Sequence, residues 1–276
     1  LHYGIKTYYN QEWGHGNEDP SRIDPTVLDT DQWAKSFADG GFKMIMVTVK
    51  HHDGFELYDS RYNTEHDWAN TAVAKRTGEK DLFRKIVASA KKYGLKVGIY
   101  YSPADSYMEK KGVWGNNSER VERTIPTLVE NDDRASKVAS GKLPTFKYKA
   151  TDYGAYMLNQ LYELLTEYGD ISEVWFDGAQ GNTAGTEHYD YGVFYEMIRR
   201  LQPQAIQANA AYDARWVGNE DGWARQTEWS PQAAYNDGVD KVSLKPGQMA
   251  ADGKLGSMSS VLSEIRSGVA NRLHWY

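Results

Sequence analysis

The chain of 276 residues contains no cysteine. This absence excludes disulfide frameworks, thiol nucleophiles and cysteine-ligated zinc sites, and it leaves the redox compartment open because either environment tolerates such a chain. The sequence also lacks an apolar run approaching the roughly 18 residues that cross a bilayer, and no charged-then-apolar leader opens it. We therefore expect no membrane span in these residues.

Positively charged residues are fewer than negatively charged ones. Lys and Arg total 32 against 38 Asp and Glu, which gives a net charge of -6 at pH 7. Because no stretch clusters Lys or Arg, we expect no nucleic-acid or anionic-membrane partner, and a neutral or cationic small ligand fits better. Aromatic residues are plentiful, with 20 Tyr and 9 Trp beside 7 Phe. Their flat faces suit a groove that stacks on sugar rings, although filling a core is their commoner use.

Short apolar segments alternate with amphipathic ones, and the sequence shows no internal repeat. The apolar segments predict buried parallel strands at residues 42–49, 95–101, 171–176 and 205–208. The amphipathic segments predict helices at 31–38, 81–93, 152–168 and 187–201, two of which end in Tyr-Gly as C-terminal caps, at Gly94 and Gly169. This alternation is typical of an α/β fold, and the length fits one (β/α) barrel of about 250 residues.

The connections between these segments differ in length. Those from helix to strand have two or three residues, whereas those that leave strand ends are long and polar: 51–80, 102–151, 177–186 and 209–230. In a (β/α) barrel the site is built from loops at the carboxyl ends of the strands. The residues just past each strand are therefore the candidates for function.

Histidines and an aspartate occupy these positions. His51 and His52 follow the first predicted strand, and from the residues alone they fit a metal pair, a hydrogen-bonding pair or ordinary loop polarity. Asp177 follows a run of mostly apolar residues and precedes a glycine, so its carboxylate should sit partly shielded at the sheet edge. The alternative for Asp177 is a cap on the next helix.

Acidic residues beside tryptophan form a second pattern. Glu12 and Trp13 are adjacent near the start of the chain, and Glu220 lies shortly after Trp216 in a long loop. A carboxylate can accept hydroxyl hydrogen bonds while an indole covers a sugar ring. Two acids on one barrel face can also hydrolyse a glycoside, but their separation, and hence retention or inversion, does not follow from sequence.

Three segments resemble the catalytic domain of the α-L-fucosidases of glycoside hydrolase family 29. They are FKMIMVTVKHHDGFELYDSRYN, DLFRKIVASAKKYGLKVGIYYSP and EVWFDGA. Their order, spacing and strand-end positions agree with that family, and the similarity extends over nearly the whole chain. The resemblance implies that Asp177 is the nucleophile and that His51 and His52 bind fucose hydroxyls. It also implies that further side chains complete the fucose pocket: His2, Glu12, Trp13, Tyr100 and Trp175.

Three further phrases resemble one branch of the family. NQEWGHGNEDP, RWVGNEDG and TEWSP are similar to the branch that acts on α-1,3- and α-1,4-linked fucose in branched, Lewis-type glycans. This implies that Glu220 is the general acid/base, for which its pKa must be raised. Asp177 would attack the anomeric carbon while Glu220 protonates the departing oxygen, and Glu220 would then activate the water that releases fucose with retention. No metal or other cofactor is implied.

The resemblance also sets expectations for the whole chain. Residues 1–276 should form one catalytic TIM-like (β/α) barrel domain that is incomplete at both ends, with a C-terminal β-sandwich outside this sequence. An incomplete barrel exposes strand edges, so we expect the segment alone to be poorly stable. The expected partner is a fucosylated oligosaccharide or glycoconjugate, and the expected location is extracellular or on a bacterial cell surface.

Two other functions fit some of the same residues. A lectin-like barrel could bind fucosylated glycans without cleaving them. A metal-dependent hydrolase could use His2, His51, His52 and Asp177, but no HxH, HExxH or Asp-rich run supports metal ligation. Replacing Asp177 or Glu220 by alanine should abolish turnover in an enzyme but leave the binding of a lectin largely intact. Activity that survives exhaustive chelation would remove the metal-dependent hydrolase.

Overall fold

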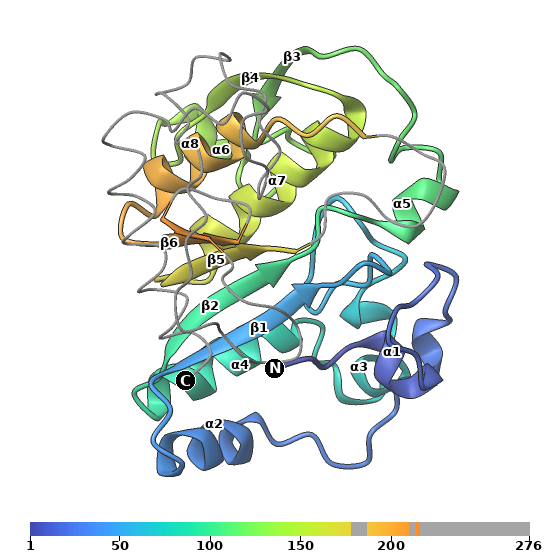
Figure 1. The fold of residues 1–276 in the computed structure, drawn as a ribbon, viewed down its shortest axis with the longest axis vertical. Helices are drawn as coiled ribbons and strands as arrows, with labels where there is room; N and C mark the ends of the chain where they lie inside the picture. Colours follow the sequence, from blue (N-terminus) through green and yellow to red (C-terminus); the bar gives the residue numbers. More distant parts are fainter. Residues whose placement is uncertain (178–186, 210–212, 216–276) are drawn as a thin grey trace, which may run out of the picture.

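The computed structural model describes residues 1–177, 187–209 and 213–215. Its centre is a five-stranded parallel sheet with the strand order β1-β2-β5-β6-β7 (Figure 1). The strands are β1 (Met44–Lys50), β2 (Lys96–Tyr101), β5 (Glu173–Phe176), β6 (Ile206–Asn209) and β7 (Ala214–Arg215). This arrangement confirms the predicted α/β fold with a parallel sheet.

Four longer helices cover the sheet. They are α2 (Thr30–Asp39), α4 (Leu82–Lys92), α7 (Asp152–Glu167) and α8 (Tyr191–Leu201). In Figure 1, α4 lies against β1 and β2, α2 packs on α4, and α7 packs beside α8. The strand faces turned to these helices carry fully buried side chains such as Val47, Ile99 and Val174, which join one large hydrophobic core. The opposite face carries a second, smaller buried cluster that includes Tyr100 and Trp175.

Side-chain caps explain where three of these helices begin. Asp29, Asp81 and Thr151 accept hydrogen bonds from backbone amides of the first turns of α2, α4 and α7. Gly94 and Gly169 follow α4 and α7 with φ angles of +70° and +78°, which a residue without Cβ adopts at no steric cost. The predicted Tyr-Gly caps are therefore confirmed, and they allow the short connections into β2 and β5.

Some predicted boundaries differ from the structure. β1 begins two residues later than expected, because the amide of Phe42 bonds Phe37 O at the end of α2 and its side chain is 61% exposed. The last helix begins at Tyr191 and not at residue 187, because Glu187 accepts hydrogen bonds from Gly115 N and Thr151 Oγ1. The segment around His2 is irregular, yet Leu1 bonds Met46 O and Thr48 N as a strand beside β1 would.

The N-terminal stretch and the connections predicted as loops contain further elements. These are α1 (Ile5–Tyr9), η1 (Pro20–Arg22), η2 (Trp68–Asn70), α3 (Ala72–Thr77), α5 (Ser106–Lys110), α6 (Ala135–Ala139) and a hairpin of β3 (Val121–Ile125) with β4 (Phe146–Ala150). Among the described residues, no helix is long and apolar enough to cross a membrane.

Candidate active site

Buried side chains line the face of the sheet that is turned away from the main hydrophobic core. Tyr100 on β2 and Trp175 on β5 are register partners, and Trp175 is paired in turn with Ala208 on β6. The three side chains are buried together, with Met46 of β1 packed against them. They form an apolar floor below the carboxyl ends of the strands.

Asp177 stands at the edge of this floor. Its backbone amide bonds Tyr101 O, which extends the β2–β5 ladder by one residue, and its side chain is 38% exposed. The hydroxyl of Tyr100 donates a hydrogen bond to Oδ2 of the carboxylate. Nε2 of His52 lies 3.8 Å from the same oxygen. The next helix among the described residues, α8, has Asp190 at its N-cap position, so Asp177 does not cap α8.

Aromatic rings pack around the two histidines. The ring centroids of His51 and His52 are 4.3 Å apart, and His51 stacks on Tyr100 with an angle of 4° between the rings. His2 meets both His51 and Tyr100 edge-on, and the ring centroids of Trp13 and His52 are 4.6 Å apart. Residues from the start of the chain therefore join the ends of β1, β2 and β5 in one cluster.

Burial keeps these histidines neutral. It lowers the pKa of His51 to about 2, and the neighbouring His52 and Lys6 add to this effect. Burial also lowers the pKa of His52, although the carboxylate of Asp177 opposes the change. The pKa of His2 is lowered by burial and by Lys6. Neutral imidazoles can both donate and accept hydrogen bonds, which suits the recognition of hydroxyl groups.

Lys6 of α1 is a site residue that the sequence reasoning missed. Its Nζ lies 2.8 Å from Nε2 of His51. Burial lowers the pKa of Lys6, while the charges of Asp53, Glu12 and Asp177 oppose this change. No local motif marks Lys6, because it reaches the site only when α1 packs beside the end of β1.

A buried ion pair fixes the loops that carry these side chains. Nζ of Lys50, at the end of β1, lies 2.8 Å from Oδ2 of Asp105, and both side chains are fully buried. Ser106 N donates to His52 O, which ties the loop after β2 to the loop after β1. Gly54 has a φ angle of +78°, and a Cβ there would stand 2.2 Å from Oδ1 of Asp105. The two loops thus approach too closely for any other residue at position 54.

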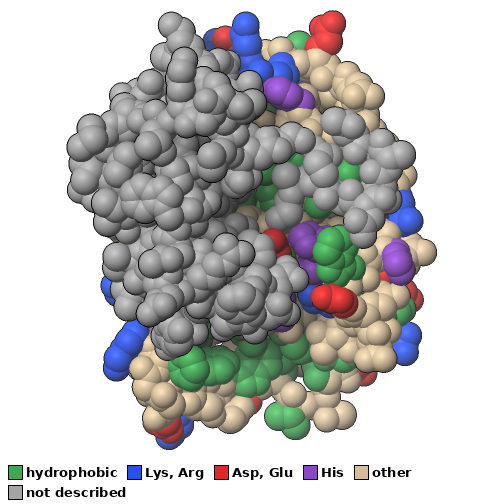
Figure 2. Space-filling view, viewed as in Figure 1, with side chains coloured by type: hydrophobic (Ala, Val, Ile, Leu, Met, Phe, Trp, Pro, Cys, Tyr) green, Lys and Arg blue, Asp and Glu red, His purple; other side chains and the backbone are tan. Residues whose placement is uncertain are grey.

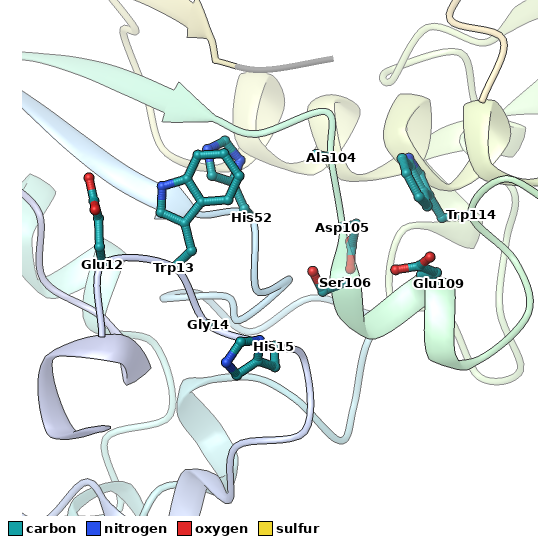
Figure 3. A pocket seen from close by; sticks show the side chains of 10 residues that line it. All are labelled: Glu12, Trp13, Gly14, His15, His52, Ala104, Asp105, Ser106, Glu109 and Trp114. Carbon is teal, nitrogen blue, oxygen red and sulfur yellow. The ribbon is translucent and has the colours of Figure 1, made fainter. Parts of the chain in front are cut away.

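A cavity of about 440 Å³ opens beside this cluster. Figure 3 shows Trp13 lying over His52 on one side, with Glu109 and Trp114 on the other. Glu12 lines the same cavity and is exposed. On the face in Figure 2, histidine, hydrophobic and acidic side chains meet near the middle of the described surface. A cavity of this size falls within the range of small-molecule sites.

The structure therefore brings together most of the residues predicted for the site. They are His2, Glu12, Trp13, His51, His52, Tyr100, Trp175 and Asp177. Glu220, the predicted acid/base, lies outside the described residues. Within the described ranges, no group of three or more His, Cys, Asp or Glu side chains is arranged to hold a metal ion.

The fold and this site define a class of protein. A parallel α/β sheet that gathers a carboxylate, neutral imidazoles and aromatic rings at the carboxyl ends of its strands has the organisation of an α/β enzyme domain. The α-L-fucosidase family model matches residues 2–237. The chain belongs to the α-L-fucosidase family of glycoside hydrolases, as the sequence resemblance implied.

Curated relatives agree with this assignment. The chain is 33% identical over 231 residues to α-L-fucosidase 1 of Arabidopsis thaliana, a match that covers 83% of this chain and 38% of the relative. It is 27% identical over 190 residues to the human plasma α-L-fucosidase, covering 68% of this chain and 32% of the relative. The chain thus spans less than half the length of these relatives.

Solved structures show the same fold. A glycoside hydrolase family 29 member from a rumen bacterium is 33% identical, with a TM-score of 0.61 over 92% of this chain and 41% of that chain. A family 29 fucosidase of Ruminococcus gnavus, a mutant solved in complex with fucose, is 27% identical, with a TM-score of 0.63 over 92% of this chain and 50% of that chain.

Proposed function

We propose that the protein containing this chain is a retaining α-L-fucosidase. The observation that carries the proposal is the position of Asp177, at a strand end, hydrogen-bonded by Tyr100 and flanked by His52. Because Tyr100 binds Oδ2, the other oxygen, Oδ1, is the one offered to an anomeric carbon. Membership of the α-L-fucosidase family and the fucose complex of a relative identify fucose as the sugar to test.

In this proposal each side chain has one task. Asp177 attacks the anomeric carbon and forms a glycosyl-enzyme ester as the bond to the leaving oxygen breaks. Glu220 gives its proton to that oxygen and later takes a proton from the water that cleaves the ester. His2, His51, His52 and Glu12 hydrogen-bond sugar hydroxyls, and Trp13, Tyr100 and Trp175 face the ring. The sheet forms part of a TIM-like (β/α) barrel.

Covalent trapping tests the nucleophile. With 2-fluoro-fucosyl fluoride, the fluorine at C2 slows both steps while fluoride leaves without acid assistance, so the ester accumulates. We expect intact mass spectrometry of the complete protein to show one added fluorofucosyl group, and peptide mapping to place it on Asp177. D177N should remain unlabelled, whereas E220Q should still be labelled. A label on another residue, or labelling of D177N, contradicts the proposal.

We further propose that the preferred substrates are Lewis-type glycans with α-1,3- or α-1,4-linked fucose. The support is the resemblance of the segments around Trp13 and Glu220 to that branch of the family. The complete protein should release fucose from a Lewis-type trisaccharide much faster than from 2-linked fucosyllactose or an aryl fucoside. Equal release from all three refutes this preference. An extracellular or cell-surface location follows from such substrates and belongs to the same proposal.

A binding module without turnover is the second candidate, because stacked aromatic rings and neutral histidines serve binding equally well. D177A and E220A separate the two candidates. In an enzyme both variants lose fucose release, whereas in a lectin both keep the fucoside affinity of the original protein and there is no turnover to lose. Calorimetric titration with fucose and a release assay on the same preparations measure both quantities.

A further inference from the structure

The hydrogen bonds around His52 determine which of its nitrogens carries the proton. Nδ1 lies 2.6 Å from Oγ of Ser102, a fully buried hydroxyl. That hydroxyl donates its own hydrogen to the backbone carbonyl of Ala104, at 2.8 Å. A hydroxyl has one hydrogen, so Ser102 can only accept from His52. Nδ1 therefore carries the proton, and Nε2 of the neutral ring keeps its lone pair.

The hydrogen bonds around His51 lead to the same tautomer by a different route. Its Nε2 is 2.8 Å from Nζ of Lys6, and an ammonium group can only donate. Nε2 of His51 therefore accepts, and the proton lies on Nδ1. Within the described part of the chain, this buried Nδ1 has no hydrogen-bond partner. A buried donor without a partner is costly unless a ligand supplies an acceptor.

We propose that Ser102 and Lys6 are positioning residues that hold His52 and His51 in the Nδ1–H tautomer, and thereby set the pattern of donors and acceptors that meets the sugar. Nothing in the roles assigned above includes these two side chains. His52 presents a lone pair at Nε2, next to Asp177, whereas the proton of His51 lies on its buried Nδ1. The proposal rests on the proposed function only for the identity of the ligand.

The tautomer of His52 has a direct consequence for the carboxylate. Nε2 of His52 and Oδ2 of Asp177 are 3.8 Å apart, and in this tautomer both are acceptors. They cannot bond each other, so a substrate hydroxyl can donate to Nε2. In the other tautomer, Nε2–H could donate to Asp177 instead. The ring would then compete with the substrate hydroxyl, and the carboxylate would lose negative charge to a second hydrogen bond.

Nuclear magnetic resonance reports the tautomers without any need for activity. Long-range ¹H–¹⁵N correlations of the complete, ¹⁵N-histidine-labelled protein distinguish protonated from bare ring nitrogens, and H51Q and H52Q assign the two rings. We expect both rings to be Nδ1–H in the original protein. S102A should shift His52 toward Nε2–H and leave His51 unchanged, and K6M should do the reverse. The two variants are therefore controls for each other.

S89A is the matched structural control, since Ser89 is also a buried serine whose hydroxyl bonds side chains, here Thr30 and Asp31. It should change neither tautomer. On a Lewis-type trisaccharide, S102A should lower kcat/KM by about tenfold, the loss expected for one hydrogen bond, while S89A stays near the original value. An Nε2–H ring at His52 in the original protein, or no change of its tautomer in S102A, overturns the proposal. If the tautomers shift as expected but no variant hydrolyses fucosides, the proposed function fails and this inference stands.

Discussion

At the scale of single residues, the site depends on the hydrogen bond that Tyr100 donates to the carboxylate of Asp177. Tyr100 is buried in the floor of the site and its hydroxyl binds Asp177. A hydrogen bond to an ionised group contributes about 1.5–3 kcal/mol. We expect Y100F to lower kcat/KM on a Lewis-type trisaccharide by roughly 10- to 100-fold, because the carboxylate loses the contact that orients Oδ1.

The matched control for Y100F is Y62F. Tyr62 also donates its hydroxyl hydrogen, here to Thr127 O, but it lies away from the site. Steady-state kinetics and a melting curve of both variants separate a local loss from a general loss of stability. Equal activity of Y100F and Y62F shows that Tyr100 does not position Asp177.

The sequence predicted the positions of some residues of the candidate site and missed others, for a physical reason. Asp177, His51 and His52 directly follow strands, so their positions depend only on the alternation that defines the sheet. Lys6 and Ser102 act through contacts with histidines about 45 and 50 positions away in the sequence. Such contacts depend on how loops pack, and no spacing rule in the sequence encodes them.

At the scale of elements, the loops after β1 and β2 are held together by the Lys50–Asp105 pair. Asp105 also accepts from Met108 N at the start of α5, and Lys50 is hydrogen-bonded to Tyr153 of α7. We expect D105N to destabilise the fold by about 3–5 kcal/mol, because the charge of Lys50 stays buried without its partner. Denaturant unfolding of the complete protein measures this difference.

An exposed ion pair is the control for D105N. Glu122 and Lys147 pair across the β3–β4 hairpin at 3.0 Å, with side chains 62% and 69% exposed. E122Q removes a carboxylate charge as D105N does, but in a position where solvent screens it, so we expect less than about 1 kcal/mol. Similar effects of D105N and E122Q contradict a structural role for the buried pair.

The same region shows which elements the sequence reasoning overlooked. Residues 146–150 alternate buried and exposed side chains, a period of two that is typical of a strand. The partner strand, 121–125, is mostly exposed, so it shows no clear alternation of burial. The alternation therefore indicates β4 but not β3, whereas short helices such as α1 and α5 depend on tertiary contacts.

At the scale of the whole molecule, buried titratable groups set the pH at which the fold is most stable. Burial raises the pKa of Asp53 to about 7 and that of Glu56 to about 8. The unfolded chain releases these protons near pH 4. The stability that the two protonated carboxyls contribute is therefore complete below pH 4 and is lost as the pH rises to 8. Burial lowers the pKa of His51 to about 2 and that of His66 to about 4. The stability that these neutral histidines contribute is therefore lost as the pH falls below 6.5. The two trends predict greatest stability at mildly acidic pH.

Glu56 allows the alkaline side of this profile to be tested. Its Oε1 accepts hydrogen bonds from Tyr156, Asn63 and Gln160, while its buried Oε2 has no partner among the described residues. The proton therefore resides on Oε2. In E56Q the amide nitrogen takes the place of Oε2, and the amide oxygen keeps the three hydrogen bonds that Oε1 accepts. The variant therefore mimics the protonated carboxyl at every pH.

We expect E56Q to melt near the original protein at pH 5 and above it at pH 8.5, by roughly 2–4 °C for each kcal/mol that the ionised carboxyl costs. Scanning calorimetry of the complete protein at several pH values measures how the slope of melting temperature against pH changes in E56Q. E122Q supplies the control, because an exposed carboxylate should leave the slope unaltered. A parallel shift of E56Q at all pH values instead indicates a change in packing, and it shows that Glu56 is already ionised in the folded state at pH 5.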